Sequence, residues 1–384
     1  MSVIAEVEAI ALRAGVDPND LDSSSETLVV RLTDEDGRTG IGEADAPAEA
    51  GGRLVLMDDV HAWSRGLRSM LMGRDPFSRD TLWYQLYEGT MWHGRRGLGI
   101  NVLSAVDVAL VDLAGKQLGR PAYQLLGGKR REYLTPYATM WPGAVAGRSL
   151  SEMMSAIEGL AQKALGAGFR AVKMEVFFDD LVDDRELVSC IREGRRMLGD
   201  EVTMMVDFGY RWHHWRDALW ALNRLEDCDL YFAEAPLQHD DLLGHAKLAA
   251  RCETRVGGAE MAATVHECRE WLERGQVDVL QPDIGRCGGL SELRRIAQLA
   301  ELYGALVIPH GWKTGITAAA SYHFQASTPN APFVEILSPA LFPSPLRAEL
   351  TRPEAEVHGG NVALPTAPGL GIELVEDALE TYRV

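Results

Sequence analysis

Short apolar runs in the part of the sequence after about residue 134 end, one after another, in an acidic or a basic residue. These terminal residues are Glu175, Asp207, Glu234, Glu260, Asp283, His310 and Glu335. Carboxylates bind hard metal ions, and histidine exchanges protons near neutral pH. The set can therefore carry out metal-assisted acid–base chemistry, provided that the fold brings its members together.

The spacing of these residues indicates which fold would do so. From Asp207 to Glu335 they lie 27, 26, 23, 27 and 25 residues apart. A strand, a helix of about three turns and two loops fill such an interval, so the residues occupy one phase of a βα repeat. With LTPYATM (134–140) as the first strand there are eight strands, which predicts a TIM-type barrel with these side chains at its C-terminal face. A single acid there could instead cap a helix, but near-constant spacing favours a shared ligand.

Three of the acids come from consecutive predicted strands and are expected to lie side by side. They are Asp207, Glu234 and Glu260. Oxygen ligands without Cys or His select a hard cation, and three carboxylates that leave positions open suit octahedral Mg²⁺. Without a cation they would repel one another. Mg²⁺ is therefore the expected cofactor, with these three residues as its ligands.

The next two strands end in Asp283 and His310, which can form an acid–base pair. A carboxylate bonded to one imidazole nitrogen fixes the tautomer and favours protonation, so His310 is predicted to be a general acid or base. On the other side of the barrel, Lys173 and Glu175 are two residues apart on one strand and both point inward. Lys173 is expected to hold a substrate carboxylate, although it could instead simply neutralise Glu175.

The remaining elements divide the chain into three predicted segments. Residues 1–125 show strands at Val3–Leu12, Thr27–Leu32 and Thr39–Glu43, followed by helices at Arg53–Met72, Arg79–Leu86 and Asn101–Leu118. Strands followed by helices are typical of an α+β unit. Residues 130–350 carry the βα repeat, with helices at Ser151–Leu165, Leu187–Leu198 and Leu290–Leu302. Residues 351–384 are expected to return to the first unit.

Composition limits the classes of function. The 384 residues are 46% hydrophobic and 24% charged, as in a globular protein. A net charge of −18, with 38 basic residues scattered among 56 acids, argues against a nucleic-acid partner. The start has no leader pattern and no apolar run reaches the length of a membrane span, so we expect a cytoplasmic protein without a membrane partner. The five cysteines are far apart and suggest neither disulfides nor a zinc site.

Together these residues resemble the mandelate racemase subgroup of the enolase superfamily. The likeness includes Lys173, the three acids, the Asp283/His310 pair and Glu335, and it extends to LSAVDVALVDLAGKQLG, VDVLQPDIGRCGG and PHGWKTG. It implies a modified (β/α)7β barrel under an N-terminal α+β capping domain that the C-terminal tail completes. It also implies Mg²⁺ on the three acids, an enolate intermediate, and a Glu335 that donates a hydrogen bond to the substrate carboxylate. A homo-oligomer is usual in this family.

Two departures from the family pattern bear on the reaction. Many members have Lys-x-Lys on the second strand, where this chain has Lys173-Met174-Glu175, so racemisation between two lysine bases is in doubt. Many members have Asp-x-Asn on the third strand, where Asp207-Phe208-Gly209 supplies no amide. A polar group must then come from elsewhere, and the candidates are Arg95, Arg211, His213 and Lys313.

With one evident base, the sequence favours dehydration of a sugar acid to a 2-keto-3-deoxy acid. The alternatives are a sugar-lactone cycloisomerase or an epimerase or racemase of a hydroxy acid, with Glu175 as a second base of raised pKa. A non-catalytic barrel is disfavoured, because clustered uncompensated charge would have no purpose in it. The sugar acid itself is expected to be selected by two capping loops, at Gly15–Ser25 and Ala46–Gly52.

Overall fold

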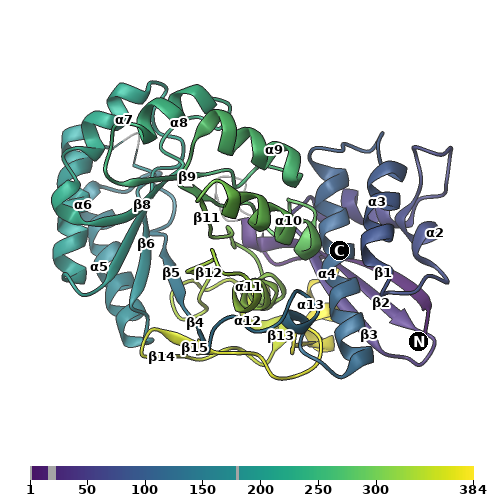
Figure 1. The fold of residues 1–384 in the computed structure, drawn as a ribbon. Helices are drawn as coiled ribbons and strands as arrows, with labels where there is room; N and C mark the ends of the chain where they lie inside the picture. Colours follow the sequence, from purple (N-terminus) through teal and green to yellow (C-terminus); the bar gives the residue numbers. More distant parts are fainter. Residues whose placement is uncertain (1, 16–22, 179–180) are drawn as a thin grey trace.

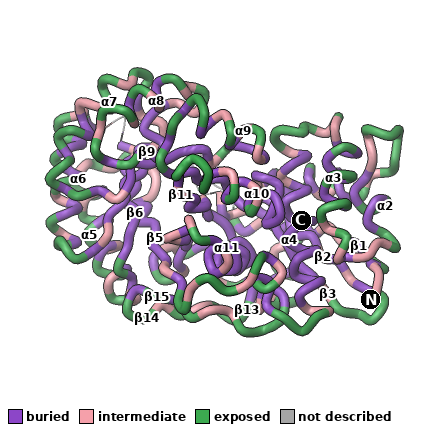
Figure 2. The backbone as a smooth tube through the Cα atoms, in the orientation of Figure 1, coloured by how far each residue is buried: buried purple, intermediate pink, exposed green. Residues whose placement is uncertain are grey.

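The computed structural model describes residues 2–15, 23–178 and 181–384. Figure 1 shows a barrel-like unit on one side and a smaller unit of strands and helices on the other, as the sequence predicted. The C-terminal segment, coloured yellow, runs along the barrel toward the smaller unit. In Figure 2 the strands inside both units are buried, whereas the outer faces of the helices are exposed.

The N-terminal unit is a three-stranded antiparallel sheet covered by helices. Its strands follow one another in space in the order β1 (Ile4–Arg13), β2 (Glu26–Asp34) and β3 (Thr39–Ala44). Helix α4 (Leu98–Leu118) lies directly on β3, and this packing depends on glycine, because a Cβ at Gly42 would stand 2.0 Å from the carbonyl oxygen of Ala105. An 18-residue window of α4 is apolar enough to cross a membrane but is 89% buried in the protein, so α4 is a core helix.

The single helix predicted at Arg53–Met72 is wrong. The chain forms α1 (Ala48–Leu56) and α2 (Leu67–Leu71), with a loop between them, and α3 (Arg79–Gly89) follows. Asp59 organises the loop, because its carboxylate accepts hydrogen bonds from the Gly66 N–H (3.1 Å) and the Arg65 Nε (2.8 Å). A local acid that bonds the backbone competes with helix formation, and an apolar pattern alone does not reveal it.

Within the described residues, the larger unit has eight parallel strands with seven α-helices between them, which confirms the predicted (β/α)7β order. Its elements are β5 (Pro136–Met140), α5 (Leu150–Gly166), β6 (Ala171–Glu175), α6 (Asp184–Leu198), β7 (Thr203–Asp207), α7 (Trp215–Leu222), β8 (Leu230–Glu234), α8 (Leu242–Ala249), β9 (Arg255–Gly258), α9 (Thr264–Glu270), β10 (Val279–Leu280), α10 (Gly289–Leu302), β11 (Leu306–Val307), α11 (Gly315–Ser327) and β12 (Val334–Ile336). The hydrogen-bonded order is β11-β10-β9-β8-β7-β6-β5-β12. The last strand along the chain, β12, therefore pairs with the first, β5, as in a barrel. Buried side chains, Tyr137, Met205, Phe232 and Ile308 among them, fill its interior.

The C-terminal segment ties the two units together. It forms α12 (Pro345–Glu349), β13 (Thr351–Arg352), β14 (Val357–His358), β15 (Asn361–Ala363), β16 (Glu373–Leu374) and α13 (Glu376–Tyr382). Strand β15 pairs with β4 (Tyr133–Leu134), which directly precedes β5, the first strand of the barrel. The Val384 N–H bonds the carbonyl oxygen of Ala11 on β1, and the Leu370 N–H bonds the Asp112 carboxylate on α4. These contacts account for the return of the tail; the predicted limits of 1–125, 130–350 and 351–384 remain a proposal.

One buried acid docks the N-terminal sheet onto a barrel helix. Glu43, on β3, accepts hydrogen bonds at Oε1 from the N–H groups of Thr314 (3.2 Å) and Thr317 (2.7 Å), at the N-terminus of α11. Its Oε2 accepts from the hydroxyls of Thr27 (3.0 Å) and Thr314 (2.9 Å). The carboxylate therefore satisfies four donors, three of which lie across the boundary between the two units.

We expect Glu43→Ala to lower the free energy of unfolding by about 3 kcal/mol, since it strands buried donors that bonded a charged acceptor. Denaturant titration measures this change. Glu43→Gln keeps one acceptor oxygen and should cost less. Equal stability of the wild type and Glu43→Ala would contradict this account of how the units dock.

Candidate active site

The register of the barrel sheet brings the predicted acids to one edge. Glu175 pairs with Asp207 across β6 and β7, and Asp207 pairs with Glu234 across β7 and β8. Glu260, Asp283 and His310 follow the ends of β9, β10 and β11 by two or three residues. These strand ends open into a cavity of about 580 Å³, whose lining includes Glu175, Asp207, Glu260 and His310.

The three predicted metal ligands stand close enough to perturb one another. Burial raises the pKa of Asp207 to about 7 and that of Glu234 to about 8, and repulsion from neighbouring carboxylates adds to both shifts. The Glu234 Oε1 is buried without a hydrogen-bond partner among the described residues. Buried, mutually repelling carboxylates with an unused oxygen are stabilised by a hard cation, so this donor set fits Mg²⁺.

The carboxylates of the three acids do not converge on one point. In the described part of the chain, no group of three His, Cys, Asp or Glu side chains has the spacing of metal ligands. Lys173 Nζ instead bonds Glu234 Oε2 at 2.8 Å, and Tyr210 donates its hydroxyl to Glu260 Oε1. A cation among the three acids would share Glu234 with the lysine.

Lys173 is buried at the centre of the acid cluster. Its Nζ lies 2.8 Å from Glu234 Oε2, 2.8 Å from Glu335 Oε1 and 3.8 Å from Asp207 Oδ2. Burial would lower its pKa, but the carboxylates of Glu234 and Glu335 raise it well above the usual value. The ammonium is therefore a permanent positive charge and cannot act as a base near neutral pH. Its direct partners are these acids rather than Glu175.

Glu335 is held as a carboxylate. Burial would raise its pKa, but Lys173, together with His310 and the hydroxyl of Thr139, lowers it to about 2. Its Oε2 accepts a hydrogen bond from the Gly311 N–H at 2.9 Å. As an ionised group Glu335 can accept a hydrogen bond from a ligand but cannot donate one. The donation implied by the family resemblance therefore requires that a ligand first protonate it.

His310 forms the predicted pair with Asp283. The Nδ1 of His310 lies 2.6 Å from Asp283 Oδ2, and its Nε2 lies 3.4 Å from Glu260 Oε2. Burial opposes the imidazolium, but Glu260 and the Asp283 hydrogen bond raise the pKa of His310 to about 9. Asp283 is itself fixed, because the Gly285 N–H donates to its Oδ1 at 2.6 Å. The Nε2 edge is thus the one that can exchange a proton with a ligand.

Glu175 faces the same cavity with a different character. Burial raises its pKa to about 8, and Glu335 and Glu234 add to the shift against the opposing effect of Lys173. Within the described residues it makes no hydrogen bond or ion pair, although only 8% of its surface is exposed. A carboxyl group of this kind can hold a proton near neutral pH and hydrogen-bond a polar ligand.

Three residues near the acids have left-handed backbone conformations that side chains other than glycine rarely adopt. They are Tyr210 (φ 63°), Ala235 (φ 43°) and Ala259 (φ 82°). Ala235 follows Glu234 and Ala259 precedes Glu260, so strained turns direct the acid side chains at two of the strand ends. Such strain is typical of functional sites, where surrounding contacts compensate for it.

The sequence did not single out several residues that contribute to the site. Tyr210 and Arg286 follow Asp207 and Asp283 by three residues and line the cavity, so their position after a strand end is the one signal that could have found them. Trp141, Phe177 and Trp312 form an aromatic part of the wall, and nothing in the strand pattern indicates it.

None of the four residues proposed to supply a polar group near the metal lines the catalytic cavity. Lys313 lies 2.8 Å from Asp45 at the boundary of the two units. Arg211 pairs with Asp184 at 2.9 Å, and Arg95 lies over the ring of Tyr87. His213 is not among the residues that line the cavity. Of the two capping loops, Ser23 and Ala46 line cavities, whereas residues 16–22 lie outside the described part of the chain.

Comparison with known sequences gives the same family for both units. The family described as enolase C-terminal domain-like matches residues 156–378, and the N-terminal domain of mandelate racemase / muconate lactonizing enzyme matches residues 21–127. The chain is 31% identical to D-galactarolactone cycloisomerase of Agrobacterium fabrum, over 93% of this chain and 91% of that protein. It is 30% identical to arabinonate dehydratase of Saccharolobus solfataricus, with the same two coverages.

Solved structures of other proteins superpose on nearly the whole length of this chain. A crystal structure of a candidate racemase superposes with a TM-score of 0.93 and 43% identity, covering 99% of this chain and 98% of that one. A racemase from Streptomyces coelicolor A3(2) with bound magnesium gives a TM-score of 0.84 and 28% identity over 100% of both chains. The chain belongs to the mandelate racemase/muconate lactonizing enzyme family of the enolase superfamily.

Proposed function

We propose that this protein removes the proton next to the carboxylate of a sugar acid with the help of Mg²⁺, and dehydrates that acid to a 2-keto-3-deoxy acid. The observation that carries the proposal is one cavity lined by His310 and by the acids Asp207 and Glu260. His310 is bonded to Asp283, and Glu234 pairs with Asp207 on the neighbouring strand. Two relatives, an arabinonate dehydratase and a D-galactarolactone cycloisomerase, support the class of substrate.

In this proposal Asp207, Glu234 and Glu260 hold the metal, and the cation supplies positive charge to the substrate carboxylate. Lys173 adds a fixed positive charge beside that carboxylate, because its ammonium is buried and stays protonated. Glu335 keeps Lys173 in place through a 2.8 Å ion pair. The protein groups are therefore arranged before substrate arrives, which is how electrostatic stabilisation avoids reorganisation cost.

His310 moves the proton in this proposal. Its Nε2 takes the proton from the carbon next to the carboxylate, and Asp283 stabilises the imidazolium through Nδ1. His310 then gives the proton to the hydroxyl on the adjacent carbon, and the bond from that carbon to the hydroxyl oxygen breaks to release water. The enol that remains loses the proton of its hydroxyl group, takes up a proton at the carbon that lost the hydroxyl, and becomes the 2-keto-3-deoxy acid.

A second candidate is an isomerase, either a lactone cycloisomerase or an epimerase. The observation that favours it is Glu175, a carboxyl in the same cavity whose pKa is raised to about 8 and which could serve as a second base. A non-catalytic barrel is the least supported alternative, because the acid cluster and the His310–Asp283 pair are both in place. A cytoplasmic location and a homo-oligomeric state remain proposals.

Product analysis separates these candidates. Hexonates, pentonates and aldarates are incubated with the enzyme and Mg²⁺, and the products are identified by NMR. The proposal predicts a 2-keto-3-deoxy acid. An isomeric lactone or an epimer as the only product would replace dehydration by isomerisation.

Glu175→Gln tests the same choice from the side of the protein. If His310 alone handles the proton, we expect KM to rise about 10-fold with kcat nearly unchanged, because the amide keeps the hydrogen-bonding shape. A true second base would instead lose about 10²–10⁴-fold in kcat. Steady-state kinetics distinguish the two results, and collapse of kcat together with an epimerised substrate would overturn the dehydratase proposal.

A further inference from the structure

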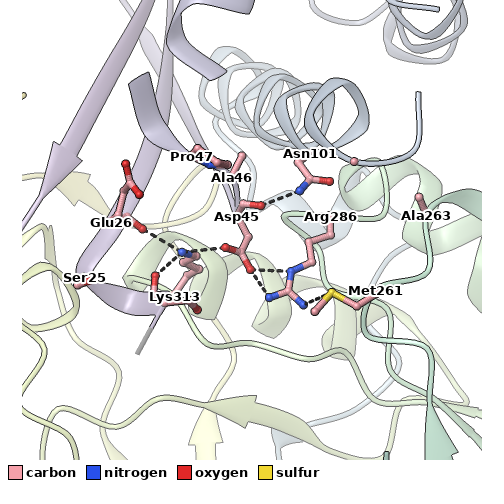
Figure 3. Close-up of a pocket in the computed structure, with 12 residues that line it drawn as sticks. Ser25, Glu26, Asp45, Ala46, Pro47, Asn101, Met261, Ala263, Arg286 and Lys313 are labelled. Atoms are coloured by element: carbon pink, nitrogen blue, oxygen red, sulfur yellow. Dashed lines mark hydrogen bonds and ion pairs between the residues drawn. The ribbon is translucent and has the colours of Figure 1, made fainter. Parts of the chain in front are cut away.

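A second cavity lies at the boundary between the N-terminal unit and the barrel. Its volume is about 450 Å³, and Figure 3 shows Asp45, Arg286, Lys313 and Met261 around it. Ser23, Met261 and Arg286 line both this cavity and the catalytic one. Arg286 therefore stands where a ligand that fills the catalytic cavity would extend toward the capping unit.

The guanidinium of Arg286 is fixed along one edge and available along another. Its Nε donates to Asp45 Oδ2 at 2.6 Å, and its Nη2 pairs with the same oxygen. Its Nη1 contacts only the sulfur of Met261, at 3.3 Å, among the described residues. Because sulfur is a weak acceptor, this edge retains donors that an anionic ligand could use.

Asp45 is held firmly enough to aim the guanidinium. Its Oδ1 pairs with Lys313 Nζ at 2.8 Å, and its carbonyl oxygen accepts from Asn101 Nδ2 at 2.7 Å (Figure 3). Its N–H donates to the Gly285 carbonyl at 3.3 Å. The ammonium of Lys313 has three N–H donors and three acceptors, because it also bonds the carbonyl oxygens of Ser23 and Glu26. Arg286 is thus the cation of this cluster with a donor left for ligand.

Other carboxylates near Arg286 are already engaged. Glu260 and Asp283 act on it electrostatically, but Asp283 bonds His310 and Gly285, and Glu260 bonds Tyr210. The nearby Glu26 pairs with Arg13 at 2.8 Å. No acid in the described part of the chain bonds Nη1, so this nitrogen is able to donate to an anionic ligand.

We propose that Arg286 binds a second carboxylate, at the end of the substrate remote from the reacting carbon, so that the preferred substrate is a dicarboxylic sugar acid. The inference rests on the proposed function for its orientation. Arginine carries donors only, and its hydrogen bonds to carboxylate are about twice as strong as neutral ones. A terminal hydroxyl would gain much less from the same contact.

Binding to an inactive variant tests the proposal apart from turnover. His310→Asn is titrated calorimetrically, in the presence of Mg²⁺, with a six-carbon aldarate, the aldonate of the same stereochemistry and that aldonate carrying a terminal phosphate. We expect the aldarate to bind about 10- to 100-fold tighter than the aldonate. Adding Arg286→Gln should remove that preference and change the aldonate affinity less than about threefold, and Arg286→Lys should retain part of it.

Arg295→Gln is the matched control. Arg295, on α10, also joins the barrel to the capping unit through Asp80 of α3 (3.4 Å), and it pairs with Glu292 of its own helix (2.8 Å), but it lines neither cavity. It should leave the aldarate preference unchanged, and thermal unfolding of each variant reports any loss of docking. Equal binding of aldarate and aldonate, an equal loss for both in Arg286→Gln, or tightest binding of the phosphate would overturn the assignment. If the variant prefers aldarate but the wild-type enzyme does not dehydrate it, only the proposed reaction is overturned.

Discussion

Replacing His310 with Asn is expected to lower kcat by about 10²–10⁴-fold while the protein remains folded. The amide can keep the hydrogen bond to Asp283, which is 2.6 Å long in the wild type, but it cannot accept a proton at the position of Nε2. Steady-state kinetics give the loss, and thermal unfolding checks the fold. Full activity of a folded His310→Asn protein would remove this residue from the chemistry.

Asp283→Asn separates the role of the histidine from that of its partner. The amide leaves His310 in place but removes a carboxylate that raises its pKa, so the pKa falls. Because His310 acts as a base when neutral, the acid limb of the kcat profile should move to lower pH, with a smaller fall in kcat than His310→Asn causes. A limb that moves to higher pH would contradict the assigned pair.

Removal of the metal is expected to stop turnover completely, and Mg²⁺ should restore it. Glu234→Gln should reproduce the loss. Because Glu234 is a predicted ligand itself, kcat should fall by more than the roughly 100-fold that is the upper limit for residues that only hydrogen-bond a ligand. The variant keeps the shape of a side chain whose Oε2 bonds Lys173, but it loses the charge that opposes the cation. Calorimetric titration with Mg²⁺ gives a readout independent of turnover.

Glu292→Gln is a control that shows whether replacing any buried glutamate with glutamine affects Mg²⁺ binding. Glu292 is 1% exposed and accepts hydrogen bonds from the Val265 N–H and from Arg295, outside the catalytic cavity. Its amide variant should bind Mg²⁺ as the wild type does. Turnover that survives thorough chelation, or equal Mg²⁺ affinity in Glu234→Gln, would defeat the metal assignment.

The sequence predicted the barrel well because two physical constraints coincide there. Each buried parallel strand must be apolar, and polar residues can begin only where it ends, so Glu175, Asp207 and Glu234 could be assigned to strand ends from spacing alone. The same reasoning placed His310 and Asp283 correctly in phase, although they follow their strands by three residues. Periodicity fixes position along a repeat and tolerates small shifts in loop length.

Contacts between distant segments could not be predicted in this way. The Asp45–Arg286 pair joins residues that are 241 positions apart, and the bonds of Glu43 to Thr314 span 271 positions. Neither pattern nor propensity encodes such a partner. The helix predicted at Arg53–Met72 is wrong for a different, local reason. Its apolar spacing is helical, but the hydrogen bonds of Asp59 stabilise a loop instead.

In the proposed reaction His310 removes the proton next to a carboxylate in the presence of Mg²⁺. The most direct test measures exchange of that proton with deuterium from D₂O, by NMR, for the sugar acid that the product screen identifies. We expect wild-type enzyme with Mg²⁺ to break this bond, which appears as deuterium in the recovered substrate or as an isotope effect on turnover. Chelated enzyme and His310→Asn should show neither deuterium incorporation nor turnover. Bond breakage at an undiminished rate in His310→Asn or in chelated enzyme would contradict the proposed reaction.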